Sequence, residues 1–181
     1  ASYVMVEQHG NIEIRNYDPM IIAEAEVVGE REGAINQGFR LIADYIFGNN
    51  TSSQEVAMTA PVTQQASEKI AMTAPVTQQV SEAGKWKVHF VMPAAYSMKT
   101  LPKPVNKGVL LKETPAKRYA VIRFSGIASN KRLEQETKDL GRFIKDKQLV
   151  SQGEPVFAFF NPPWTLPFLR RNEVMIEIDN N

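Results

Sequence analysis

Apolar and polar residues alternate along much of this chain, with the two-residue period of β-strands that have one buried face. The alternation is clear in residues 12–17, which read Ile-Glu-Ile-Arg-Asn-Tyr. Asp18 and Pro19 then form a turn signal that ends the segment. By the same criteria we predict strands at residues 3–7, 12–17, 20–28, 86–92, 109–113, 118–124, 156–160 and 173–178.

Two segments follow the helical period instead. In residues 31–48 the apolar residues recur every three or four positions and end at Gly48, which predicts a helix with one apolar stripe. The stripe consists of Ala34, Ile35, Phe39, Ile42, Ile46 and Phe47. A second helix is predicted at residues 130–148, with Leu133, Leu140 and Ile144 facing inward. A stripe wider than the sheet can cover would leave Phe39 and Phe47 exposed.

The order of these elements occurs twice. Two strands, a helix and two more strands occupy residues 12–92, and the same order returns in residues 109–178. A one-faced sheet and a one-striped helix cannot bury their apolar sides alone, so we expect the two halves to join. The predicted fold is α+β: a distorted antiparallel β-barrel flanked by two helices, built from two ββαββ halves related by a pseudo-twofold axis. Residues 1–181 would form one domain.

A short repeat lies between the first helix and the strand at 86–92. Residues 56–65 (VAMTAPVTQQ) return as residues 70–79 (IAMTAPVTQQ), fourteen positions later. We expect the second copy, at residues 70–77, to be the structural strand, because it lies one hairpin away from the strand at 86–92. The first copy would form an added hairpin or loop. A tandem duplication that only lengthens a hairpin explains the repeat without any function.

Composition excludes several classes of function. Lysine and arginine (21) nearly balance aspartate and glutamate (20), and no long run of like charge occurs, so we expect no nucleic-acid partner. No apolar run approaches the ~18 residues that a membrane span needs. The 43% apolar and 23% charged residues are ordinary for a soluble globular protein.

The sequence contains no constellation typical of an enzyme. Without cysteine, thiol nucleophiles, disulfides and thiolate metal sites are excluded. We find no serine elbow, no histidine pair at metal-ligand spacing and no phosphate-binding glycine loop. The glycines of residues 29–33 (GEREG) lack the dinucleotide-binding spacing. We therefore assign no catalytic residue and no metal ligand, and predict a binding protein rather than an enzyme.

Several short motifs, taken together and in order, resemble those of the SOUL haem-binding protein family over nearly the whole chain. They are residues 12–17 (IEIRNY), 45–49 (YIFGN), 71–76 (AMTAPV), 90–93 (FVMP), 124–126 (FSG), 161–165 (NPPWT) and 170–174 (RRNEV). The doubled MTAPV is similar to the bacterial branch of the family, whose members are often exported. The chain also begins at Ala1 without an initiator methionine, so we expect an exported or periplasmic protein, with a cytoplasmic location as the alternative.

The resemblance implies a haem or a related tetrapyrrole as ligand and cofactor, bound against the first helix near the loop that precedes the last strand. In this sequence those places contain Phe39, Arg40, Ile42, Ala43, Ile46, Phe47 and Trp164. Haem is a flat apolar ring with two carboxylates, so an apolar face and a cation such as Arg40 suit it. The same helix stripe is equally explained as core.

An axial iron ligand is the missing part of this site. Where some animal relatives carry a histidine, this chain has Asn16. His9 lies in a turn, and the alternation places His89 beside Lys87 on the outer face of its strand. Met58 and Met72 are thioethers, which usually fill a core. We therefore predict reversible, low-affinity binding by apolar contact, without a strong axial histidine.

Two further interpretations stay open. Cations for the haem carboxylates are few: besides Arg40 only Arg15 is near, and we expect Arg170 and Arg171 to hold the last strand through hydrogen bonds and a salt bridge. The protein would then bind another small apolar molecule. Alternatively it is a protein-interaction module that uses the Pro-Pro-Trp loop, residues 162–168. Exposure of Trp164, Phe168 and Leu169 would favour the second alternative.

Overall fold

The structure is a computed structural model that describes residues 2–51, 69–70, 75–82, 84–161 and 164–179. Two α-helices and eleven β-strands occur within these residues. In the first half they are β1 (Tyr3–His9), β2 (Ile12–Tyr17), β3 (Met20–Val28), α1 (Arg31–Ile46), β4 (Asn50–Thr51), β5 (Val76–Glu82) and β6 (Lys85–Val91). In the second half they are β7 (Lys103–Pro104), β8 (Val109–Thr114), β9 (Lys117–Phe124), α2 (Asn130–Asp146), β10 (Ser151–Phe159), the 3-10 turn η1 (Pro167–Leu169) and β11 (Asn172–Ile178).

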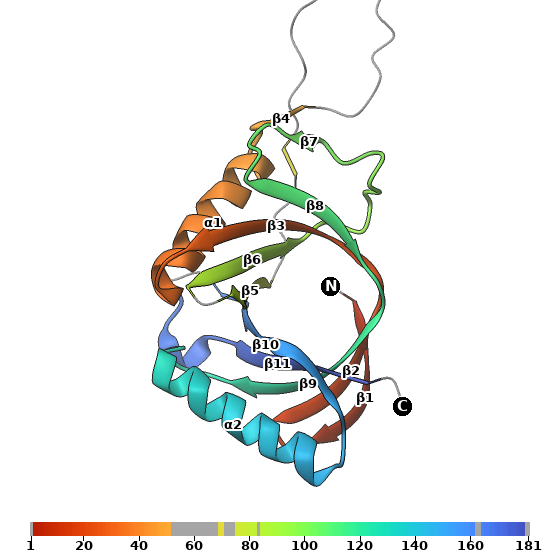
Figure 1. Ribbon diagram of the computed structural model, residues 1–181, viewed down its shortest axis with the longest axis vertical. Helices are drawn as coiled ribbons and strands as arrows, with labels where there is room; N and C mark the ends of the chain where they lie inside the picture. The colour runs from red at the N-terminus through yellow and green to blue at the C-terminus, as the bar shows by residue number, and fades with distance from the viewer. Residues whose placement is uncertain (1, 52–68, 71–74, 83, 162–163, 180–181) are drawn as a thin grey trace, which may run out of the picture.

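Nine of the described strands form one antiparallel sheet, in the order β1-β2-β9-β11-β10-β5-β6-β3-β8. Figure 1 shows that this sheet is strongly curved, with both helices on its outer, convex side. Within the described residues β1 pairs only with β2 and β8 only with β3, so the sheet has two edges. The predicted barrel is therefore wrong in its closure, while the α+β class, the antiparallel pairing and the two flanking helices are confirmed.

The strand order relates the two halves. From the middle pair β10–β5, the sequence β10-β11-β9-β2 runs one way and β5-β6-β3-β8 runs the other. Each half thus contributes a β-α-β-β unit (β3, α1, β5, β6 and β9, α2, β10, β11) and pairs one more strand with the opposite half. This order suits a pseudo-twofold relation, but the rotation itself stays a prediction.

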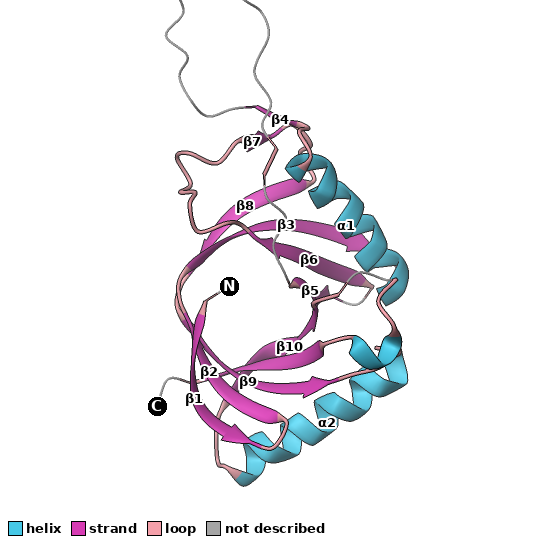
Figure 2. Ribbon diagram, turned by 180° about the vertical axis from the view of Figure 1, so that it is seen from behind, coloured by secondary structure: helices cyan, strands magenta, loops and turns pink. Residues whose placement is uncertain are grey.

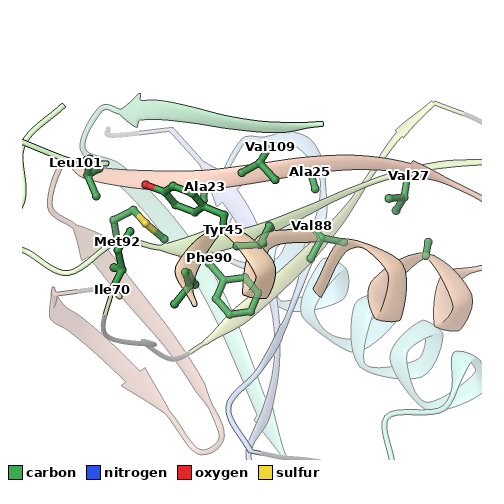
Figure 3. Close-up of a cluster of buried hydrophobic side chains, with 13 residues drawn as sticks. Ala23, Ala25, Val27, Tyr45, Ile70, Val88, Phe90, Met92, Leu101 and Val109 are labelled. Atoms are coloured by element: carbon green, nitrogen blue, oxygen red, sulfur yellow. The ribbon is translucent and has the colours of Figure 1, made fainter. Parts of the chain in front are cut away.

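Each helix covers the outer face of its own half of the sheet (Figure 2). Under α1 the core contains Ile42, Tyr45 and Ile46 from the helix and Val88 and Phe90 from β6. Figure 3 shows this cluster, with Tyr45 and Phe90 as its largest side chains. Under α2, Leu133, Leu140 and Ile144 pack on the outer face of β9 and β11. Outer-face positions of the sheet are therefore core, and the inner, concave face is left for other roles.

The helices begin where the sequence predicts and end two residues earlier. The hydroxyl of Ser129 caps α2 by accepting from the backbone N–H of Arg132 at 3.2 Å. The N-cap residue of α1, Glu30, makes no such bond. Instead, Arg31 joins the two helix starts by donating from Nε to Oδ1 of Asn130 at 2.5 Å.

The second copy of the repeat differs from its prediction. The strand is β5, Val76–Glu82, so it starts at the end of the predicted 70–77 segment and runs into the residues that follow the repeat. It forms a hairpin with β6, as predicted. Ile70 is buried beneath α1, and its backbone N–H donates to the carbonyl of Ile46 at 2.9 Å. The first copy lies outside the described residues.

Candidate functional site

The residues predicted to contact a tetrapyrrole on α1 lie on two sides of the helix. Ile42 and Ile46 are completely buried and Ala43 is 8% exposed, so these three belong to the core. Phe39 and Phe47 are 38% and 59% exposed. Arg40 is also exposed. The sheet therefore leaves two aromatic side chains of the predicted stripe, Phe39 and Phe47, uncovered. The available surface on α1 is therefore Phe39, Arg40 and Phe47.

Trp164 lies away from the end of α1 that carries Phe47. The chain around it is held near the start of α2, because the backbone N–H of Gly126 donates to the carbonyl of Pro167 at 2.9 Å. α1 begins beside α2, as the Arg31–Asn130 hydrogen bond shows, and runs for 16 residues to its far end, at a rise of ~1.5 Å per residue. The views in Figures 1 and 2 agree that η1 lies near the helix starts. Trp164 itself is 83% exposed.

The arginines near the predicted site have structural roles. Arg15 is completely buried on the concave face; its Nη1 and Nη2 donate to the two oxygens of Glu173 at 2.8 and 3.0 Å. Burial disfavours the charged guanidinium, but Glu173 outweighs it and raises the pKa of Arg15. Arg171 contacts the same carboxylate at 2.7 Å, and Arg170 donates to the carbonyl of Thr165. The prediction that Arg170 and Arg171 fix the last strand through hydrogen bonds and a salt bridge is confirmed. Arg15 is bound to Glu173 and is therefore not available to a haem carboxylate.

Neither histidine faces α1. His9 lies on β1, where its Nε2 is 3.0 Å from Glu7 and its ring is 5.3 Å from that of Phe143 in α2. His89 lies on the same face of β6 as Lys87, opposite to Val88 and Phe90, as predicted. The prediction that this is the outer face is wrong, because α1 covers the outer face and His89 faces the concave side. Met58 and Met72 lie outside the described residues. The described part of α1 thus fits an apolar ring and one carboxylate, without an imidazole for the iron.

A pocket of about 310 Å³ opens on the concave face of the sheet, between its two halves. We call it the concave pocket. One wall comes from β3, β5, β6 and β8, and the opposite wall from β1, β2, β9, β10 and β11. Its lining includes charged and aromatic side chains together with a methionine: Tyr17, Glu24, Lys87, His89, Tyr119 and Met175. Sequence reasoning did not predict this pocket.

A chain of polar contacts crosses the first wall. Nε2 of His89 lies 3.0 Å from Oε2 of Glu24, and Nδ1 of His89 lies 3.2 Å from the hydroxyl of Thr77. Lys112 donates to the other oxygen of Glu24 at 2.5 Å. The bond from His89 and the charge of Lys112 lower the pKa of Glu24 to about 2, although burial opposes this. Glu24 is therefore ionised at neutral pH, with both oxygens occupied.

Tyrosines form much of the opposite wall. The Tyr17 and Tyr119 rings meet edge to face at 5.6 Å, and Tyr3 lies 5.0 Å from Tyr17. Burial raises the pKa of Tyr17 to about 12, even though its hydroxyl accepts from Arg15 at 3.0 Å. Burial also raises the pKa of Tyr119, so both phenols stay protonated at neutral pH. Val156 and Met175 complete an apolar surface beside these rings.

A signal for this pocket is present in the sequence. Glu24 alternates with apolar neighbours in one predicted strand, and Lys87 and His89 do so in another. The bland interpretation of such residues is a solvated face. Only the pairing of β3 with β6 sets Glu24 opposite His89, and that register is not readable from either strand alone.

Two further observations concern the described residues. They contain no group of three or more histidine, aspartate or glutamate side chains placed to hold a metal ion. They also contain no helix with the length and apolar character that crossing a bilayer requires.

Solved structures share this fold at low sequence identity. The C-terminal domain of EcmrR has a TM-score of 0.67 and 9% identity, covering 93% of this chain and 96% of that one. A hydrolase from Listeria innocua has a TM-score of 0.62 and 9% identity, covering 93% and 92%. SAV2435, solved bound to tetraphenylphosphonium, has a TM-score of 0.53 and 12% identity, covering 93% and 94%. At such identities the likeness is one of fold alone.

Sequence comparison identifies the family. A search of curated proteins found no match. The family model of the SOUL heme-binding protein matches residues 1–68 and again residues 63–177. The two matches overlap at residues 63–68, across the end of the first repeat copy, and together cover nearly the whole chain. This chain therefore belongs to the SOUL heme-binding protein family.

Proposed function

We propose that this protein binds haem or a related tetrapyrrole reversibly, on the exposed face of α1. The observation that carries the proposal is membership of a family described as heme-binding. The structure contributes two exposed aromatic side chains, Phe39 and Phe47, on one helix that also presents Arg40. Exposed apolar surface beside a cation suits a flat ring that carries carboxylates.

Apolar contact accounts for most of the proposed affinity. Burial contributes ~25 cal/mol per Å² of apolar surface, so one face of a large ring on Phe39 and Phe47 is worth several kcal/mol. The loss of translational and rotational freedom on association takes back much of this gain. We therefore expect an affinity in the micromolar range. Arg40 would add a salt bridge to a carboxylate, and its exposure keeps that contribution small.

The experiment is a titration of the protein with haemin and, separately, with metal-free protoporphyrin. Because neither described histidine faces α1, we expect similar affinities for the two compounds. A haemin affinity far above that of protoporphyrin, with a sharp shifted Soret band, would show an iron ligand and contradict binding by apolar contact alone.

Substitutions locate the site. Phe47→Asp should weaken binding of both compounds by more than about tenfold, because it places a charge in the apolar contact. Phe39→Asp should do the same, although Phe39 also contacts the Phe90 ring at 5.5 Å, so its melting temperature must be measured too. Phe168→Asp is the matched control, since Phe168 is 69% exposed and lies in η1. Equal losses in all three variants would argue against a site on α1.

One observation favours a second function, that of an interaction module. Trp164, Phe168 and Leu169 are 83%, 69% and 62% exposed and lie within six residues of one another. A patch of this kind is typical of a contact surface for another protein. If wild-type protein binds neither haemin nor protoporphyrin, this loop becomes the better candidate.

A further inference from the structure

The concave pocket is separated from α1 by the sheet itself. Successive residues of β6 point to opposite faces: Val88 and Phe90 pack under α1, while Lys87 and His89 line the pocket. A ligand in the pocket and a ring on α1 would therefore contact different residues. The pocket's function is independent of the proposed tetrapyrrole site.

The volume and lining of the pocket suit a small aromatic molecule. Its volume of about 310 Å³ lies at the low end for sites of drug-sized ligands. Tyr17, Tyr119 and Met175 provide an aromatic and apolar wall, against which another aromatic ring packs edge to face or offset. A group of one or two fused rings matches this wall.

The buried carboxylate does not make the pocket a cation site. Lys112 and His89 already occupy the two oxygens of Glu24. A cationic ligand would have to displace one of them, and Lys112 would then be left without its carboxylate. Glu24 is better understood as part of the wall than as a ligand contact.

The remaining charges give the pocket its selectivity. Three lysines line it: Lys112 is paired with Glu24, and Lys117 is paired with Glu177 at 2.6 Å. Lys87 makes no ion pair with any residue that the structure describes. It does lie opposite Glu26 in the strand register, at a more exposed position.

Glu113 is a further acidic residue of the pocket lining, and it does not neutralise Lys87. It lines the pocket and follows Lys112 in β8. Neighbouring residues of a strand point to opposite faces, and Lys112 points to Glu24 on the concave face. The carboxylate of Glu113 is therefore directed away, toward the face where Leu111 packs on the core. The pocket therefore retains one lysine without an ion pair among the described residues, and the exposed carboxylate of Glu82 interacts with its charge at longer range.

We propose that the concave pocket binds a small aromatic carboxylic acid. Its ring lies against Tyr17, Tyr119 and Met175, and its carboxylate pairs with the ammonium of Lys87. The ring supplies apolar contact, and the lysine selects an anion over a neutral or cationic molecule of equal size.

Three naphthalene probes of similar size test this selectivity by calorimetric titration of the full chain. They are 2-naphthoate (anionic), 2-naphthamide (neutral) and 2-naphthylmethylammonium (cationic). A hydrogen bond to a charged group is worth roughly a factor of ten, so naphthoate should bind about tenfold more tightly than naphthamide. The cation should bind more weakly than either. Equal binding of all three, tighter binding of the cation, or no binding of naphthoate would overturn the proposal.

Substitution of the lysine assigns the effect to the pocket. Lys87→Met should remove the preference for naphthoate over naphthamide, and Lys87→Arg should keep it. Lys103→Met is the matched control, because Lys103 is an exposed lysine on β7, outside the pocket lining. A Lys87→Met protein that melts like wild type and still prefers naphthoate would contradict the role of Lys87.

The same variants separate this proposal from the tetrapyrrole site. Phe47→Asp should leave naphthoate affinity unchanged, and Lys87→Met should leave haemin affinity unchanged. Loss of both ligands in either variant would show that the two sites are one. Loss of haemin binding alone leaves the aromatic-acid site standing.

Discussion

Two clusters of charged residues, each built around a buried carboxylate, hold the concave face at the level of single residues. In one, Arg15 joins Glu13 and Glu173; in the other, Glu24 joins His89 and Lys112. Each cluster links strands that are distant in sequence, since Arg15 and Glu173 are 158 residues apart and Glu24 and Lys112 are 88 residues apart. Removing one partner leaves an uncompensated buried charge, which costs more than the intact pair contributes. These residues therefore fix which strands lie opposite one another.

The Glu24 cluster should make stability depend on pH in acid. The pKa of this carboxyl is about 2 in the folded protein and 4.5 unperturbed, so its contribution is present above pH 4.5 and is lost as the pH falls toward 2. Glu24→Gln should reduce the free energy of unfolding by roughly 2–3 kcal/mol at pH 7. The gap to wild type should then close between pH 4.5 and 2. Urea unfolding of both proteins at pH 7, 5, 4 and 3 measures this difference in the free energy of unfolding.

Glu134→Gln is the control for this experiment. Glu134 pairs with Lys138 at 2.6 Å on the exposed face of α2, where water screens the charges. Its substitution should leave unfolding nearly unchanged at every pH. A gap between Glu24→Gln and wild type that stays constant down to pH 3 would show that the Glu24 carboxylate is not the titrating group.

At the scale of elements, the packing of α1 on the sheet depends on a glycine. Gly38 is buried, and a Cβ added there would lie 2.5 Å from Cγ2 and 2.6 Å from Cβ of Val88 in β6. Such contacts are shorter than real side chains allow, so helix and strand would have to separate. Gly33, five residues earlier in the same helix, has nothing within 4 Å of an added Cβ.

The two glycines should therefore respond to alanine with opposite signs. Gly38→Ala should destabilise the protein by about 1–3 kcal/mol, because it overpacks the contact between α1 and β6. Gly33→Ala should stabilise it by up to about 1 kcal/mol, because alanine restricts the unfolded chain and favours the helix. Thermal unfolding measures both. A stabilising Gly38→Ala would show that α1 has room to move outward.

Element positions were largely predictable because each depends on a local period. The alternation gave β2 and β3 with their observed limits, and the helical stripe gave both helices. β5 was placed too early, because its observed residues 76–82 include the polar Thr77, Gln78 and Gln79. Gln78 is completely buried and donates to the carbonyl of Arg31 at 2.8 Å. A buried polar side chain of this kind does not show in a pattern of apolar positions.

At the scale of the whole molecule, the sequence indicates which face of each strand is apolar and the order of the elements along the chain. It does not indicate whether the sheet closes into a barrel. Periodicity shows which side of β1 or β8 is apolar, and it does not show whether the two edge strands meet. For the same reason the α1 surface could be predicted from one helix, while the concave pocket could not. Its lining residues come from all nine strands of the sheet, and their proximity depends on pairings such as β10 with β5.

The last prediction concerns the repeat as a part of the whole chain. Deleting residues 55–68 removes one repeat unit and joins Gln54 to Lys69, which leaves four residues between Thr51 and Ile70. Those ends are held near the same end of α1: the Asn50 side chain donates to the carbonyl of Tyr45, and the Ile70 N–H donates to that of Ile46. Extended chain spans ~3.3 Å per residue, so four residues can bridge them.

The deleted protein should therefore fold, with a modest loss of melting temperature. Shortening a loop changes its closure entropy by well under 1 kcal/mol. The buried Ile70 and the β5–β6 hairpin both remain. Circular dichroism and a thermal melt of the purified deletion variant measure the outcome, with Ile70→Asp as the control that should lose much more stability. If the deletion variant yields only insoluble protein while Ile70→Asp folds, the first copy is an integral part of the fold.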